Sequence, residues 1–171
     1  MATFVPTLKG LDNQNGETLT MAQSLSKMGC HLIFSTKARY AFLSDKDVRE
    51  HTHAYLAGIL REHDCPTLLV GGVSDHVHLL FALSKNRSIA DIVYEVKRSS
   101  SKWIKSQGAV FTKFHWQGGY GAFSVSQSHV EQVRRYIAAQ EHHHRKTTFQ
   151  DELREFFRKY EVDYDERYVW D

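Results

Sequence analysis

The chain contains 171 residues and has a mass of 19.8 kDa, which fits one compact domain and excludes three domains that each bury a core. Hydrophobic residues make up 42% of the chain and charged residues 25%, so the composition excludes a chain that is disordered throughout. The 22 lysine and arginine residues nearly balance the 20 acidic residues, which leaves a formal net charge of +2. Any binding site for a nucleic acid must therefore be a local patch.

The sequence also indicates where the protein works. Its two cysteines, Cys30 and Cys65, are too few for a disulfide framework and are typical of a reducing compartment. No apolar run reaches the roughly eighteen residues of a membrane span, and the start lacks the layout of a secretion signal. We therefore expect a cytoplasmic protein with no membrane partner.

The first part of the chain is predicted to form a helix and three strands after a polar extension. Residues 1–20 are polar and show no sustained period, so we expect a flexible extension, followed by a single domain over 21–171. Residues 30–36 have the β-branched and aromatic content of a strand. Ser44 is expected to cap a helix over 45–63. Two apolar runs after that helix, 66–73 and 77–83, predict an antiparallel hairpin.

The second part is predicted to contain three helices and two short extended segments. Ser88 opens a helical stripe that continues to about Lys105. The extended segments flank the glycine-rich turn 118–121. Further caps at Ser128 and Thr148 predict a helix that ends near His143 and a last helix. The order β-α-β-β-α-β-β-α-α predicts an α+β fold, an antiparallel sheet with helices packed mainly on one face.

Two groups of histidines stand out among the eleven in the chain. His76 and His78 are two residues apart in a predicted strand, so both imidazoles face the same side of the sheet. Two ligands could converge there, although a pair of hydrogen-bonded sheet histidines is the simpler interpretation of this pattern alone. The consecutive residues 142–144 would fan out around a helix and cannot all face one ion. We interpret them mostly as solvated residues at a helix end.

A hydroxyl and an amide are predicted to line up on the third helix. Tyr136 and Gln140 are four residues apart, which places them on one face about one turn from each other. A half-buried core tyrosine with a hydrated hydroxyl is the competing interpretation of this pair.

Taken together, these residues resemble a known family. The segments that carry the resemblance occur in order along the chain: Asp75-His76-Val77-His78, then Trp116-Gln117-x-Gly119-Tyr120-Gly121-Ala122-Phe123-Ser124, then Tyr136-Ile137-x-x-Gln140-x-x-His143. The chain resembles a single-tyrosine transposase of the insertion-sequence-200 type over residues 21–168. Such enzymes cleave single-stranded DNA and are built around a histidine-hydrophobic-histidine pair on a ferredoxin-like core, also described as RRM-like.

The resemblance implies a site and a reaction. His76, His78 and Gln140 would hold a divalent metal ion, Mg²⁺ or Mn²⁺, and Tyr136 would be the nucleophile. The implied enzyme cleaves and rejoins single-stranded DNA at hairpin-bearing element ends through a covalent 5′-phosphotyrosine. Because this ester conserves the bond energy, no nucleotide cofactor is expected. The resemblance further implies a homodimer in which the tyrosine of one subunit can serve the histidine pair of the other, and an association with the nucleoid when the enzyme acts on DNA.

Basic residues on two predicted helices are candidates for contact with DNA. They are Lys97, Arg98 and Lys102 on the second helix, and Arg134 and Arg135 beside the tyrosine. Solvated helix faces are the competing interpretation. Two other functions stay open: a domesticated relative that acts on repeated palindromes, and a non-catalytic module that binds nucleic acid on its sheet.

Overall fold

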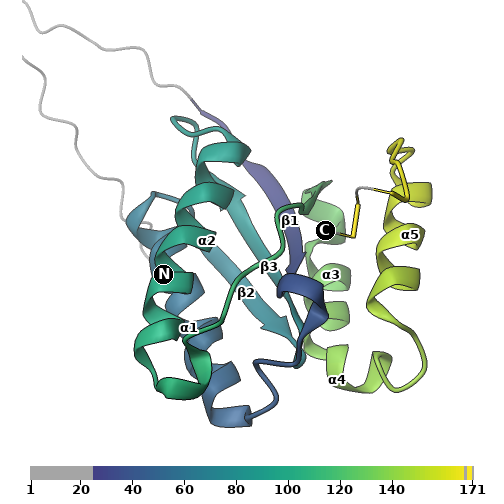
Figure 1. Ribbon diagram of the computed structural model, residues 1–171. Helices are drawn as coiled ribbons and strands as arrows, with labels where there is room; N and C mark the ends of the chain where they lie inside the picture. The colour runs from purple at the N-terminus through teal and green to yellow at the C-terminus, as the bar shows by residue number, and fades with distance from the viewer. Residues whose placement is uncertain (1–24, 168, 171) are drawn as a thin grey trace, which may run out of the picture.

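A computed structural model describes residues 25–167, 169 and 170. The predicted extension over residues 1–20 lies outside these described residues. A four-stranded sheet forms the centre of the molecule (Figure 1), and its strand order is β2-β3-β1-β4. All three pairs of neighbouring strands are antiparallel. The strands are β1 (Met28–Ser35), β2 (Thr67–Gly72), β3 (His76–Leu83) and β4 (Gly121–Val125).

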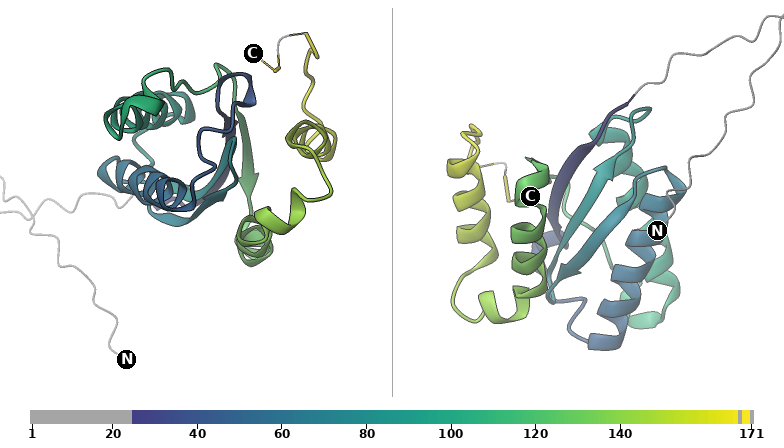
Figure 2. Two further views of the ribbon diagram at one scale, coloured as in Figure 1. Left: turned by 60° about the horizontal axis from the view of Figure 1, so that its bottom comes forward. Right: turned by 180° about the vertical axis from the view of Figure 1, so that it is seen from behind.

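Helices cover both faces of this sheet, as Figure 2 shows. The two longest, α1 (Lys46–Glu62) and α2 (Ile89–Ser106), pack side by side on one face. The shorter helices α3 (Val130–Ala138), α4 (Gln140–His143) and α5 (Phe149–Lys159) lie on the other face. The α+β class and the antiparallel sheet are therefore confirmed. The expectation that helices pack mainly on one face of the sheet holds for α1 and α2. The C-terminal helices form a second layer on the other face.

The two faces of β3 explain this three-layer arrangement. Val77, Leu79 and Phe81 alternate along the strand and belong to the large core that is shared with α1 and α2. Leu80 points the other way and packs with residues of β4 and α3. The intervening His76 and His78 share the face of Leu80, because side chains alternate across a strand. The histidine pair therefore lies between the sheet and the C-terminal helices.

Side-chain caps fix where the helices begin, with two differences from the sequence prediction. Ser88 and Thr148 cap α2 and α5 as predicted, each accepting a hydrogen bond from the backbone N–H three residues on. The cap of α1 is Asp45 and not Ser44, since the Asp45 carboxylate accepts from Val48 N. The predicted third helix begins at Val130 without a side-chain cap.

The third predicted helix is also interrupted. Its first part ends at Ala138, and Ala139 has φ −92° and ψ 7°, outside the regular helical range. The short helix α4 then begins at Gln140. This break turns the chain between the predicted nucleophile and the residues that follow Gln140.

The expected extended segment before the glycine-rich turn is reduced to one bridge, between Thr36 and Trp116. The Trp116 indole is buried in the large core, and its N–H donates to the Ser100 hydroxyl at 2.9 Å. This anchoring fixes the start of the turn against α2. Within the described residues, none of the helices is both long and apolar enough to cross a membrane.

Candidate active site

The strand β3 brings the predicted histidine pair into a fully enclosed position. His76 and His78 are both 0% exposed. Each ring uses one nitrogen to bond a neighbour: His76 Nδ1 lies 2.7 Å from Asp75 Oδ1, and His78 Nδ1 lies 3.0 Å from His31 Nε2. Such partners fix the orientation of an imidazole and decide which nitrogen is left for a ligand. The Nε2 atoms of both rings face the helix layer.

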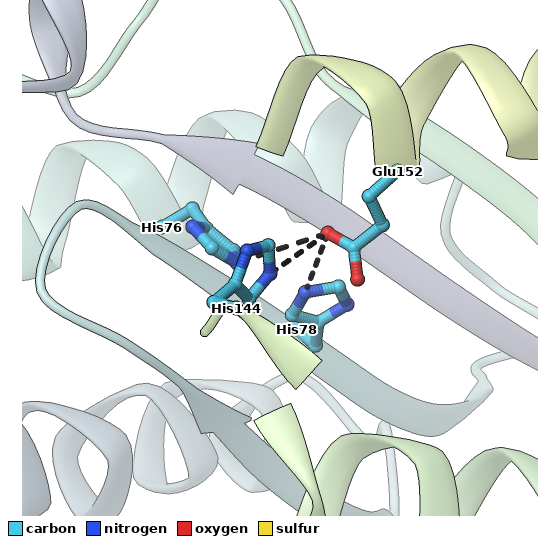
Figure 3. Close-up of side chains that lie close together, drawn as sticks. All are labelled: His76, His78, His144 and Glu152. Atoms are coloured by element: carbon cyan, nitrogen blue, oxygen red, sulfur yellow. Dashed lines mark ion pairs between the residues drawn. The ribbon is translucent and has the colours of Figure 1, made fainter. Parts of the chain in front are cut away.

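A carboxylate and a third imidazole approach these Nε2 atoms (Figure 3). Glu152 Oε2 lies 3.8 Å from His76 Nε2 and 3.6 Å from His78 Nε2. His144, which follows α4, places its Nε2 3.3 Å from the same oxygen. One ligand atom from each of these four residues lies within 4.8 Å of the others. Three separate segments of the chain thus contribute to one cluster.

Burial controls the charge of this cluster. It lowers the pKa of His78 well below the usual value and that of His144 to about 4, which keeps both rings neutral near pH 7. Burial also raises the pKa of the Glu152 carboxyl to about 7. Neutral imidazoles present lone pairs, and neutral imidazole is the form that binds a metal ion.

The buried atoms of the cluster test whether a divalent ion fits. His78 Nε2, His144 Nε2 and Glu152 Oε2 have no hydrogen-bond partner among the described residues. Buried polar atoms are rarely left unpaired, because each costs about 1–3 kcal/mol. Imidazole nitrogen and carboxylate oxygen are both ordinary ligands of divalent cations. The donor set therefore fits a divalent metal ion.

The predicted tyrosine and glutamine reach the same carboxylate from the other side. The Tyr136 hydroxyl donates a hydrogen bond to Glu152 Oε1. The Gln140 amide donates to that oxygen at 2.8 Å, and its Oε1 lies 3.3 Å from His76 Nε2. The structure thus brings together all four residues that the sequence singled out for the site. Glu152 Oε1 faces the tyrosine, with His143 Nε2 at 3.8 Å, and Oε2 faces the imidazoles of the cluster.

Sequence reasoning missed Glu152 and His144. Glu152 occupies a position of the apolar stripe of α5, between Phe149, Leu153 and Phe156. A charged residue on an apolar helix face was the available signal for this site. No comparable signal existed for His144, because its inward position depends on the break in the helix. The His144 ring is held in this position by a hydrogen bond of 2.8 Å between its Nδ1 and Thr147 O.

The predicted DNA-contact residues fall into two groups. Arg134 and Arg135 are exposed on α3, the helix that carries Tyr136. The three residues on α2 lie across the sheet from the histidine pair. Of these, Arg98 forms an ion pair of 3.7 Å with Glu95, and Lys102 is exposed.

Lys97 differs from the other basic residues because its ammonium group is half-buried. It donates to the carbonyl oxygens of Gln117, Gly118 and Gly119 at 2.6–3.2 Å. It also lies 5.0 Å from the centroid of the Phe34 ring. Burial lowers its pKa to about 8. The structure shows Lys97 as the anchor of the glycine-rich turn.

Comparisons with known proteins identify the family to which this chain belongs. The family profile of the IS200-like transposases matches residues 24–140, so this chain belongs to that family, whose members are enzymes that act on DNA. A solved structure assigned as a transposase of Deinococcus radiodurans has a TM-score of 0.55 and 25% sequence identity, covering 71% of this chain and 96% of its own.

A second solved structure is a REP-associated tyrosine transposase bound to a REP hairpin. Its TM-score is 0.47 and its identity 11%, over 72% of this chain and 70% of its own. No curated protein matches the sequence. The family match ends at Gln140, so His144 and Glu152 lie beyond the matched region.

Proposed function

We propose that this chain is a metal-dependent transposase that cleaves and rejoins single-stranded DNA at hairpin-bearing element ends, through a covalent 5′-phosphotyrosine on Tyr136. One observation carries the proposal. The phenol of Tyr136 and the Nε2 atoms of His76 and His78 face the same buried carboxylate, that of Glu152. A nucleophile and a set of metal ligands at this separation can act on one phosphate group.

The metal ligands come from the cluster on the sheet. His76 and His78 hold the ion, together with Gln140 as the resemblance implies, and with His144 and Glu152 as further donors. Imidazole nitrogens favour Mn²⁺ over Mg²⁺ in affinity, whereas Mg²⁺ is more abundant, so both ions are candidates. When bound, the ion supplies a Lewis acid for a phosphate oxygen. Asp75 and His31 keep the two rings oriented.

Glu152 is the group that activates the tyrosine. A free phenol has a pKa of about 10, so only a small fraction is ionised near pH 7. Because the Tyr136 hydroxyl already donates to Glu152 Oε1, the carboxylate is placed to accept the phenol proton. As the phenol oxygen bonds to phosphorus, the bond between phosphorus and the 3′ oxygen breaks, and that oxygen takes up a proton from solvent and leaves as a hydroxyl. The 5′ phosphate stays on the tyrosine.

The reverse reaction rejoins strands. A phenolate is a better leaving group than an alkoxide, so a DNA 3′-hydroxyl can attack the phosphotyrosine and release Tyr136. As the 3′ oxygen bonds to phosphorus it gives up its proton to solvent, the bond between phosphorus and the phenol oxygen breaks, and Glu152 returns to the phenol oxygen the proton that it accepted. Because the ester bond is exchanged and not hydrolysed, the proposal needs no nucleotide cofactor.

Arginines on the tyrosine helix are proposed to hold the substrate. Arg134 and Arg135 are exposed next to Tyr136 and can bind the phosphates on either side of the scissile bond. Arg98 and Lys102 are on α2, which covers the other face of the sheet, so we propose that they contact DNA outside the cleavage site. We do not assign a DNA contact to Lys97, because its three donors already bond the turn.

Two further features stay proposals. The homodimer with a tyrosine acting in trans follows from the resemblance, and in this chain the tyrosine lies beside the histidine pair of its own subunit. A domesticated relative that acts on repeated palindromes would use the same chemistry.

The non-catalytic alternative needs an open sheet for base stacking, whereas both faces of this sheet are covered by helices.

A covalent-adduct assay tests the proposal. The full chain is incubated with labelled single-stranded and double-stranded hairpin DNA in the presence of Mn²⁺, and denaturing gels reveal any protein that carries DNA. We expect an adduct with single strands only, its loss in Tyr136→Phe and after chelation of the metal, and its retention in Tyr164→Phe. Adducts that persist in Tyr136→Phe would overturn the proposal.

A further inference from the structure

The cavity next to Tyr136 is not explained by the metal cluster or by the nucleophile. It has a volume of about 430 Å³ and lies between the end of β4, α3 and α5. Tyr136 and Glu152 line it together with aromatic and polar side chains that the proposed reaction leaves unused. A volume in this range suits a small organic ligand and not a duplex.

One wall of this cavity is an aromatic surface held in place by its neighbours. The Phe156 ring stacks on Phe123 at a centroid distance of 5.1 Å, and Tyr160 lies 4.7 Å from Phe123 on the same side. Phe156 and Tyr160 are only partly buried, so each ring keeps an accessible part. Aromatic rings of this kind bind unpaired nucleobases by stacking, at about 1–3 kcal/mol per base.

The opposite wall offers an unused amide. Gln132 lies four residues before Tyr136 on α3, so both side chains share one face of the helix. It is exposed, and its amide forms no hydrogen bond with another described residue. An amide carries donors and an acceptor and can therefore pair with the edge of a base.

The position of the cavity fixes which base would enter. The Phe156 ring lies 5.8 Å from the Tyr136 ring, and both line the same space. These two rings are close enough for a nucleotide whose base stacks on Phe156 to bring its own phosphate to Tyr136. Lys159 at the rim adds a positive charge for the next phosphate.

From this geometry we propose that the cavity binds one unpaired nucleobase of the DNA, that of a nucleotide flanking the scissile phosphate. Phe156 and Tyr160 stack on the base, and Gln132 reads its edge. A base inside a duplex cannot reach the cavity without leaving its stack. The cavity thereby selects single strands and gives a base preference beside the cleavage point. This inference rests on the proposed function.

The first test sequences the covalent adducts. The full chain is incubated with Mn²⁺ and a pool of single-stranded DNA in which randomised nucleotides flank a hairpin, and the trapped DNA is sequenced. We expect one enriched base next to the linkage, a flat distribution in Gln132→Ala, and an adduct yield about ten-fold lower in Phe156→Leu. The matched control Gln127→Ala changes an exposed glutamine outside the cavity and should keep the enrichment.

Failure of the inference differs from failure of the proposed function. Adducts without a base preference, or a preference that Gln132→Ala retains, would overturn the cavity as a base-binding site. If no adduct forms at all, the proposed reaction fails, and a second measurement still tests the cavity. Single-stranded DNA containing 5-iododeoxyuridine is photo-crosslinked to the full chain, and the linked peptide is identified by mass spectrometry. We expect crosslinks at Phe156 or Tyr160, and crosslinks at other residues only would refute the inference.

Discussion

Substituting Glu152 by glutamine probes the electrostatics of the site in the metal-free protein. The side chain is 2% exposed, and burial raises its pKa from 4.5 to about 7. Between these two values the folded chain binds more protons at this group than the unfolded chain does. The free energy of unfolding therefore falls as the pH rises through this window. The difference between a pKa of 4.5 and a pKa of about 7 corresponds to about 3 kcal/mol.

Chemical denaturation of both proteins from about pH 4 to about pH 8 measures this effect. The lowered pKa values of His78 and His144 act in the opposite direction, since these rings lose protons on folding, but they are present in both proteins. As the pH rises, the free energy of unfolding of the natural chain should therefore fall by about 3 kcal/mol relative to that of Glu152→Gln. Mn²⁺ should stabilise the natural chain more at the upper end of this pH range than at its lower end. Parallel pH profiles for the two proteins would refute this reasoning.

Three more substitutions test other parts of the structure. Lys97→Met removes charged hydrogen bonds to the turn and should lower the free energy of unfolding by about 1.5–3 kcal/mol, measured by urea denaturation, with little change in the affinity for single-stranded DNA. Arg135→Ala should weaken binding to single-stranded DNA and reduce the slope of log K against log salt by about 0.7 per lost phosphate contact; an unchanged slope would exclude the contact. Gly71→Ala would place a Cβ 2.7 Å from Ile137 Cγ2, so it should shift α3 and slow adduct formation, whereas the Cβ of Gly58→Ala would make only an ordinary contact of 3.9 Å with Arg61 Nη2 and should leave the rate unchanged.

Much of the fold could be predicted because its signals are local. Alternating side chains define β3, and the pair Ser88 and Asp91 defines the start of α2. The C-terminal layer could not be placed, because its helices have apolar faces that could pack against either side of a sheet. Its position depends on Ile137 and Leu153, which meet partners far away in the sequence.

The candidate site divides in the same way. His76 and His78 were predicted from a strand period, and Tyr136 and Gln140 from a helix period, and the structure brings the four together. Glu152 enters the site only through the packing of α5 against the sheet, which no local pattern specifies. The interpretation of the histidines at 142–144 as solvated residues is wrong for His144, whose side chain is 11% exposed and faces Glu152.

For Lys97, the structure adds contacts that the sequence could not predict. A lysine among other basic residues on a helix predicts contact with DNA. In the structure, three carbonyl oxygens of the turn accept its hydrogen bonds, and these acceptors become neighbours only when the turn folds over α2.

Peptide mapping of the covalent DNA adduct tests the central claim most directly. The chain is allowed to react with single-stranded hairpin DNA and Mn²⁺, the DNA and protein are digested, and the peptide that retains a nucleotide is identified by mass spectrometry. The geometry around Glu152 predicts a 5′-nucleotide on the Tyr136 oxygen and on no other residue. A nucleotide on a different side chain, or a cleaved strand with no nucleotide left on the protein, would contradict it.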